Sequence, residues 1–549
     1  MSQWITRSDA VHWYMEELSS HVVAKSGIPS DRHHLGKLIF QSFKDAPDHT
    51  LQIDGATDES ETFGSALTRS VQCATAMRNL GLKCGDTIVV MSPNHIHFSI
   101  PIYAAFYLGI TVAVIDMTMG IYDLRETLKN IGPKVVYCQS DRVEVVRSVL
   151  QMLKVDTQIV TFDKSDQYLC LFELLKENGS DISVNDFKVA DFDPAETILL
   201  LIATSGSTGL PKSAAISHKN MVVTVLYLWT NFKKFPMPTR MSVLLSPNQW
   251  YSAHFQVVCS PIMRHTRLQS SATLTQKHIC YLINKYRPTF TLSSTITLQN
   301  LIRNSKRYNC NLTSFETILV GGSFVHPSFI EDLKKISPKT QTIVIYGMSE
   351  VPGLSFNFDL NRPTSLGTPI QGLEYKLINP ATLEVIVEAN VPGELCLKGP
   401  GVFKGYYNNP EATAEILMDD GWLRTGDIMY RDETSYYYYV DRKKLLFKYD
   451  CNQISPLEIE NVILTHPGVF QVAVSSVPHE YGDLIVACVV PHEGYQITAQ
   501  EIKSLVKESL SDSKQLRGGV IFLKELPLTS TSKINHPKLA AMVLSMRRE

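Results

Sequence analysis

One stretch of the sequence combines the residue types that bind phosphate: Thr204-Ser205-Gly206-Ser207-Thr208-Gly209-Leu210-Pro211-Lys212. Its two glycines let the backbone approach an anion closely, and its hydroxyl groups, backbone amides and lysine charge can contact phosphate oxygens. An apolar run (197–203) precedes it and a helix-like segment (220–229) follows, which predicts the order strand, loop, helix. It is not a Walker A loop, because Lys212 follows a proline. The residues alone leave two interpretations open, a nucleotide polyphosphate site and a surface turn.

Three further polar loops each follow a segment that we expect to be a strand: 247–252, Gly321-Gly322-Ser323 and Tyr346-Gly347-Met348-Ser349-Glu350. Ligands of open parallel sheets bind beyond the carboxyl ends of the strands, so these are candidate binding loops. Taken one at a time they indicate only a tight turn or a polar loop. Their order and spacing relative to the phosphate-type loop make them specific.

The loop at 204–212 resembles the [ST]-S-G-[ST]-T-G-L-P-K-G signature of the adenylate-forming superfamily, which includes acyl-CoA synthetases, coumarate:CoA ligases and firefly luciferase. Ser213 stands where the signature has its last glycine. Segments 346–350, 421–427, 441–445 and 529–534 resemble later motifs of this superfamily, in the same order. The resemblance covers about residues 42 to 539, and segment 516–520 is similar to the insect luciferase-like acyl-CoA synthetases.

The resemblance implies a site for ATP, Mg²⁺ and coenzyme A. In it the ring of Tyr346 covers adenine, Asp427 accepts hydrogen bonds from both ribose hydroxyls, and Glu350 binds Mg²⁺, which neutralises the triphosphate before an anion attacks it. Lys533 is the implied catalytic lysine, because a cation beside both reacting oxygens stabilises the transition state. The implied ATP-binding residues are Thr204, Ser205, Gly206, Ser207, Thr208, Gly209, Lys212, Gly322, Ser323, Tyr346, Gly347, Ser349, Asp427 and Arg442.

The acid-binding positions implied by the resemblance are Thr224, Gln249, Trp250 and Tyr251. Trp250 stands where many relatives have a glycine, and its bulk would shorten an acyl tunnel. Thr224 stands where luciferase has an arginine that contacts luciferin, which argues against light emission.

The resemblance also implies a hinge between two domains, with Asp441 and Lys444 as its residues. Lys448 would enter the site for the transfer to coenzyme A. Three departures from the superfamily pattern fall on functional loops: Ser532 and Cys451 replace glycines, and His536 replaces an arginine.

The elements that must position these residues follow from the alternation of short apolar strands with helical patterns. Expected strands at 87–91, 110–115 and 135–138, with helices at 65–80 and 122–130, predict βαβ units and a parallel sheet. Expected strands at 242–246, 289–292, 317–320 and 341–345 predict a second doubly wound sheet. The polar segment 163–193 is interpreted as an irregular surface insertion.

We therefore predict an α/β protein with a large N-terminal domain of two doubly wound sheets plus a barrel-like β segment, and a small mobile α+β C-terminal domain. The predicted boundaries are 1–440 for the AMP-binding domain, 441–445 for the hinge and 446–549 for the cap domain. Helices are expected at 456–466 and 498–510, and strands at 469–477, 484–490 and 519–523.

The composition argues against several classes of protein. The chain has 549 residues and a net charge of −2 from 52 basic and 54 acidic residues, so no nucleic-acid partner is indicated. Ten cysteines occur without a C-x-x-C pair, which favours reduced thiols. The segment 98–115 is uncharged, but its proline and glycine favour a buried helix and strand over a membrane span. The oligomeric state is left open.

These observations predict an ATP-dependent acid:CoA ligase that forms acyl-AMP and then an acyl-CoA thioester from a fatty or aromatic acid. Two alternatives remain: an adenylate-forming enzyme with weak or non-CoA acyl transfer, and a degenerate paralogue that binds nucleotide or fatty acid without turnover. A cytoplasmic location is expected; relatives often carry the peroxisomal signal Ser-Lys-Leu, whereas this sequence ends in Met546-Arg547-Arg548-Glu549.

Overall fold

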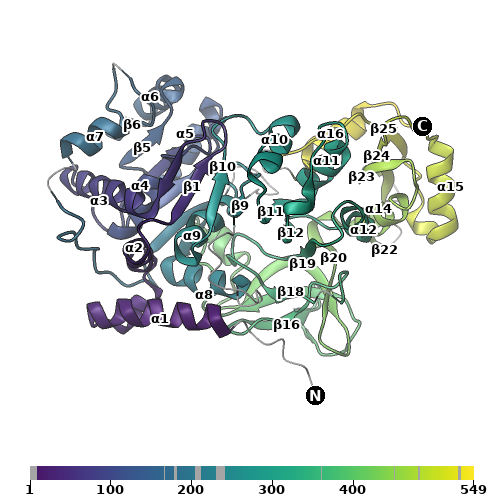
Figure 1. Cartoon of the computed structure of the whole chain (residues 1–549). Helices are drawn as coiled ribbons and strands as arrows, with labels where there is room; N and C mark the ends of the chain where they lie inside the picture. The colour runs from purple at the N-terminus through teal and green to yellow at the C-terminus, as the bar shows by residue number, and fades with distance from the viewer. Residues whose placement is uncertain are drawn as a thin grey trace.

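The computed structural model of the chain describes residues 9–165, 167–178, 182–204, 212–229, 241–359, 361–449, 452–479, 482–529 and 533–549. Figure 1 shows a large N-terminal domain, built from two mainly parallel sheets and an antiparallel β region, beside a small α+β domain at the C-terminus. The fold class predicted from the sequence is confirmed.

The first sheet has the order β6-β5-β3-β4-β7-β8, and all neighbours are parallel except the β7–β8 pair. Its strands are β3 (Thr87–Met91), β4 (Thr111–Val114), β5 (Val135–Cys138), β6 (Gln158–Thr161), β7 (Ile198–Thr204) and β8 (Lys212–Ser217). The associated helices are α3 (Phe63–Asn79), α4 (Ser99–Leu108), α5 (Ile121–Ile131), α6 (Val143–Leu153), α7 (Leu171–Asn178) and α8 (His218–Trp229), with the short turn η2 (Ser140–Arg142).

Two local predictions in this sheet are wrong. The expected order strand, loop, helix is interrupted by β8, which pairs antiparallel with β7 before α8 begins at His218. The positive end of the helix dipole therefore does not directly follow the phosphate-type loop. The segment 163–193 contains α7, because Leu171, Leu174 and Leu175 form an apolar stripe that packs into the main core.

The second sheet has the order β13-β12-β11-β9-β10-β1-β2 and is parallel except at the β1–β2 edge. Its strands are β1 (Thr50–Asp54), β2 (Ser60–Thr62), β9 (Met241–Val243), β10 (Thr266–Gln269), β11 (Phe290–Ser294), β12 (Thr317–Gly321) and β13 (Gln341–Val344). Its helices are α9 (Tyr251–Met263), α10 (Gln276–Tyr286), α11 (Thr295–Ser305) and α12 (Pro327–Ile336), with the turn η3 (Leu312–Ser314). The predicted second doubly wound sheet is confirmed.

The antiparallel region carries the chain from the second sheet to the small domain. Its five-stranded sheet has the order β17-β16-β18-β19-β20. The elements of this region are β14 (Phe356–Asn357), β15 (Thr368–Pro369), β16 (Glu374–Ile378), β17 (Val385–Ile386), β18 (Gly393–Lys398), α13 (Pro410–Ala414), β19 (Leu423–Arg431) and β20 (Tyr437–Arg442).

The small domain follows the turn η4 (Lys443–Leu445) and has its own buried apolar clusters. Its elements are β21 (Phe447–Tyr449), β22 (Asn452–Ile454), α14 (Pro456–Ile463), β23 (Val469–His479), β24 (Gly482–Pro491), α15 (Ala499–Ser509), η5 (Asp512–Lys514), β25 (Gly519–Phe522) and α16 (His536–Ser545). The exact domain limits at 440 and 446 stay predictions.

The N-terminal elements α1 (Asp9–Ser26), η1 (Pro29–His33) and α2 (Leu35–Asp45) precede the first strand. Helix α4 is buried along its whole length and ends at Gly109, whose φ of 69° is left-handed and suits glycine. The predicted buried helix followed by a strand at 110–115 is therefore confirmed. Among the described residues, the helices all lack the length or the apolar content that crossing a membrane requires.

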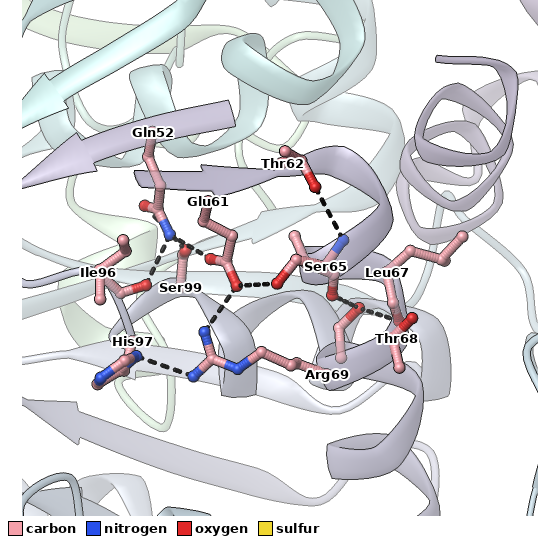
Figure 2. Close-up of polar contacts among 12 residues, drawn as sticks. Gln52, Glu61, Thr62, Ser65, Leu67, Thr68, Arg69, Ile96, His97 and Ser99 are labelled. Atoms are coloured by element: carbon pink, nitrogen blue, oxygen red, sulfur yellow. Dashed lines mark hydrogen bonds and ion pairs between the residues drawn. The ribbon is translucent and has the colours of Figure 1, made fainter. Parts of the chain in front are cut away.

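A buried polar network joins β1, β2 and the helices of the first sheet. Gln52 donates to Glu61 at 2.6 Å, Glu61 accepts from Arg69 at 2.6 Å, and Arg69 contacts Nδ1 of His97 at 2.8 Å (Figure 2). Arg267 of β10 donates to the side-chain oxygen of the same Gln52 amide. Because buried polar groups need partners, this network fixes how β1 of the second sheet packs on helices of the first.

In the small domain, the carboxyl group of Glu460 accepts the backbone amide of Val474 at 2.7 Å, and burial raises its pKa to about 8. The folded state therefore holds a proton that the unfolded chain, with a pKa of about 4.3, releases. The free energy of unfolding should fall as the pH rises from about 4.5 to 8.

We expect Glu460→Gln, which keeps the acceptor oxygen, to raise the thermal unfolding midpoint by a few degrees at pH 9 and to change it little at pH 5. Calorimetry at both pH values measures this, with the exposed Glu508→Gln as the matched control. Equal shifts of the Glu460 variant at both pH values would contradict the assignment.

Candidate active site

Asp427 is the centre of the site and lies almost fully buried on β19. Its Oδ2 accepts the hydroxyl of Tyr346 at 2.6 Å, and its Oδ1 accepts Nε of Arg442 at 3.0 Å. Arg442 is its neighbour across the β19–β20 pair, so the sheet register creates this ion pair. Gly426 has a φ of 72°, and Thr425 Oγ1 accepts the Asp427 amide at 3.1 Å, which together fix the local turn.

Tyr346 comes from the loop after β13 and is placed by packing on Phe356, with ring centroids 5.7 Å apart. Burial and the negative charge of Asp427 raise the pKa of Tyr346 well above its usual value. The hydroxyl is therefore neutral and acts as a hydrogen-bond donor. It satisfies one oxygen of Asp427 without cancelling the negative charge.

Glu350 belongs to the same loop as Tyr346 and is only 8% exposed. Its Oε1 accepts the hydroxyl of Tyr406 at 2.6 Å. Lys212 lies over the ring of the same tyrosine, with Nζ 5.2 Å from the ring centroid, and pairs with Glu415 at 3.3 Å. Tyr406 therefore links the cation that ends the phosphate-type loop to the candidate metal-binding carboxylate.

Lys533 comes from the small domain and lies inside the site. Burial lowers the pKa of Lys533, the charge of Arg442 lowers it further, and the charges of Glu350 and Asp427 raise it. A Cβ atom added at Gly322 would lie 4.0 Å from Cε of Lys533 and 3.2 Å from the indole of Trp250. The cap domain is thus positioned with its lysine beside the glycine loop after β12.

The four predicted acid-binding residues lie on two helices and the turn between β9 and α9. Trp250 precedes α9, with its indole over Gly322. Thr224 of α8 is buried, and its hydroxyl donates to the backbone oxygen of Asn220 at 2.8 Å. The hydroxyl of Tyr251 is buried, and Gln249 is half-buried.

The structure brings together the predicted residues Tyr346, Glu350, Asp427, Arg442 and Lys533. Of the two predicted hinge residues, Asp441 is buried and accepts hydrogen bonds from the hydroxyl of Ser455 and, at 3.3 Å, from the amide of Leu457, whereas Lys444 is exposed. Gly322, Ser323 and Gly347 are exposed, and Ser349 is half-buried. The predicted residues Ser205, Gly206, Ser207, Thr208 and Gly209, and the departures Cys451 and Ser532, lie outside the described residues, as does the side chain of Lys448.

Sequence reasoning missed two residues of the site, Tyr406 and Thr425. Tyr406 lies in the Gly405-Tyr406-Tyr407 segment, which we interpreted as scaffold and not as part of the site. Its contact with Glu350 joins residues 56 apart in sequence, so no local pattern could reveal it. Thr425 could have been predicted, because a threonine hydroxyl two residues before an aspartate can accept a hydrogen bond from the backbone amide of that aspartate.

Glu350 fits a magnesium ion. A carboxylate is a hard oxygen ligand, and Mg²⁺ in nucleotide sites is held by one or two carboxylates together with phosphate oxygens. The hydrogen bond from Tyr406 occupies Oε1 of Glu350 and orients the carboxylate, which leaves Oε2 available as a metal ligand. Groups of three or more histidine, cysteine, aspartate or glutamate side chains that could hold a metal ion are absent from the described residues.

Comparisons with known proteins find similar enzymes along most of the chain. The family model for AMP-binding enzymes matches residues 39–407, and the model for the C-terminal domain of AMP-binding enzymes matches residues 458–533. The chain is 30% identical to luciferin 4-monooxygenase of Photuris pensylvanica, covering 88% of this chain and 90% of that protein. It is 27% identical to 4-coumarate-CoA ligase 1 of Narcissus pseudonarcissus, covering 93% and 94%.

The fold is similar to that of ATP-bound MatB from Rhodopseudomonas palustris, with a TM-score of 0.82 at 21% identity, covering 93% of this chain and 98% of that one. At this identity the likeness concerns the fold.

The contact between Tyr406 and Glu350 predicts a weaker metal affinity in Tyr406→Phe. The variant keeps the ring beneath Lys212 but loses the charge-assisted hydrogen bond that orients the carboxylate, so we expect the affinity for Mg²⁺ in the presence of ATP to fall by on the order of tenfold. Titration of ATP binding by calorimetry at several Mg²⁺ concentrations measures this. Tyr407→Phe is the control, and an unchanged Mg²⁺ dependence in Tyr406→Phe would refute the role.

Proposed function

The chain belongs to the AMP-binding enzyme family, whose model matches residues 39–407, and on this premise we propose that it is an ATP-dependent acid:CoA ligase. It converts a carboxylic acid and ATP into acyl-AMP and pyrophosphate, and then transfers the acyl group to the thiol of coenzyme A. The observation that carries this proposal is the convergence of Asp427, Glu350 and Lys533, from three regions of the chain, on one place.

The nucleoside end of ATP is assigned to Asp427 and Tyr346. The Asp427 carboxylate has fixed orientation, since each oxygen already accepts one hydrogen bond, and each oxygen keeps a lone pair for a ribose hydroxyl. Arg442 keeps the charge of this buried group compensated. The ring of Tyr346 offers a flat apolar face to the adenine.

In the first half-reaction an oxygen of the substrate carboxylate attacks the α-phosphorus of ATP. The new bond is a mixed anhydride, the bond from the α-phosphorus to the bridging oxygen breaks, and pyrophosphate leaves. Two anions must approach each other, so a cation between them stabilises the transition state, and Lys533 is the residue for this role. A Mg²⁺ ion held by Glu350 would supply further neutralisation of the phosphate charge.

In the second half-reaction the coenzyme A thiol loses its proton and its sulfur attacks the acyl carbonyl, so that AMP leaves. The cap domain must rotate about residues 441–445 to withdraw Lys533 and to bring in the strand that carries Lys448. Support for a hinge here comes from Asp441, which lies one residue before the end of β20 while its carboxylate accepts hydrogen bonds from Ser455 and Leu457 at the start of α14.

The acid is proposed to be compact or of medium length. Trp250 fills the space over Gly322 beside Lys533, where a smaller residue would leave room for a longer chain. The similarity to a coumarate-CoA ligase supports an organic acid that is then transferred to coenzyme A. An adenylating enzyme with weak transfer remains the second candidate, because Cys451 and Ser532 replace glycines; accumulation of acyl-AMP in the presence of coenzyme A would favour it.

We expect Lys533→Ala to lower acid-dependent ATP–pyrophosphate exchange by about 10²–10³-fold, the effect of losing one transition-state donor. Because burial lowers the pKa of Lys533, exchange by the wild type should decline at alkaline pH, while Lys533→Arg should keep its residual activity to higher pH. The exposed Lys524→Ala is the control. Unaltered exchange in Lys533→Ala would exclude the assigned role.

We expect Trp250→Gly to shift the preference toward longer or bulkier acids by about tenfold or more in relative kcat/KM, because the lost indole enlarges the pocket. A pyrophosphate-release assay with a graded series of acids measures the shift. An identical acid profile in the variant would show that the indole does not limit the pocket.

A further inference from the structure

The two domains touch at a second place that the proposed reaction does not use. Helix α11 of the large domain faces β23 of the small domain (Figure 1). The guanidinium of Arg303 lies 4.3 Å from the ring centroid of Phe470, and the side chains of Gln299 and Gln471 are hydrogen-bonded at 3.3 Å. We call these four residues the α11–β23 contact.

In each domain, the local secondary structure places the two contact residues side by side. Gln299 and Arg303 are four residues apart in α11, so they lie on one face of the helix. The pairing of β23 with β24 shifts register between Val469 and Gln471, so a bulge falls on Phe470. Bulges redirect side chains, and this one allows two consecutive residues of a strand to reach the same helix.

Packing and hydrogen bonds within the small domain connect the α11–β23 contact to Lys533. Leu539 and Val543 of α16 are fully buried in one apolar cluster with Ala473 and Val477 of β23. Lys533 lies shortly before α16, and its backbone is tied to Thr529 by two hydrogen bonds of 2.7 and 3.2 Å. The position of β23 therefore sets the position of the loop that carries Lys533.

We propose that the α11–β23 contact is a latch that holds Lys533 in the site and so sets the balance between the two half-reactions. The proposal rests on the proposed function, because rotation of the cap for the second half-reaction must break the contact. The latch residues do not touch the reacting atoms and act through the orientation of the domain. A cation over an aromatic ring and a side-chain hydrogen bond form in one orientation only, so they shift the equilibrium toward it.

The latch predicts that Arg303→Ala and Phe470→Ala each expose Lys533. We expect the rate of Lys533 acetylation by an N-hydroxysuccinimide ester, followed by mass spectrometry, to rise about three- to tenfold in both variants. The double variant should equal either single variant, since each removes the same contact. Arg307→Ala is the matched control, because Arg307 lies just beyond α11 and stacks on Tyr308 within its own domain.

Activity gives the second measurement. Pyrophosphate exchange should fall by the same three- to tenfold in Arg303→Ala and Phe470→Ala, while thioester formation from supplied acyl-adenylate should be unchanged or faster. Lys533 acetylation at the wild-type rate in both variants would overturn the latch. A wild-type enzyme that releases no pyrophosphate with any acid would instead overturn the proposed function, and the acetylation measurement would still decide on the latch.

Discussion

Each of the two carboxylates at the centre of the site accepts a hydrogen bond from a tyrosine hydroxyl. A buried carboxylate without a partner is costly, and a site for a polyphosphate cannot give all its cations to its own anions. The neutral phenols of Tyr346 and Tyr406 resolve this constraint, because they orient Asp427 and Glu350 without cancelling their charge, which in the proposed site serves ribose hydroxyls and a metal ion. Arg442 pairs with Asp427 and Lys212 pairs with Glu415, while Lys533 lies beside both central carboxylates.

The architecture follows from the need to bring these groups together from distant parts of the chain. The loop after β13 supplies Tyr346 and Glu350, the antiparallel sheet supplies Asp427 and Arg442, and the cap domain supplies Lys533. The β19–β20 register fixes Asp427 and Arg442, whereas packing on Phe356 and the hydrogen bond from Tyr406 hold Tyr346 and Glu350. The fifth, Lys533, depends on the orientation of a separate domain, so under the proposed hinge the site is complete in only one arrangement of the two domains.

Much of this could be predicted from the sequence. Motifs with glycine, hydroxyl and carboxylate at fixed spacing revealed the family, and alternating apolar strands and helices revealed both parallel sheets. The hairpin of β7 and β8 was missed because residues 213–217 pair with a preceding strand instead of showing a strong pattern of their own. The contact of Tyr406 with Glu350 and the contact of Arg303 with Phe470 could not be predicted either, because each joins side chains that are far apart in sequence.

The most direct test of the central claim is a crystal structure with Mg²⁺ and a non-hydrolysable ATP analogue. The account predicts ribose hydroxyls on Asp427, the metal ion on Glu350 and the Lys533 ammonium beside the α-phosphate. A nucleotide bound elsewhere, or bound here with Asp427 and Glu350 making no contact to it or to the metal, would contradict the account.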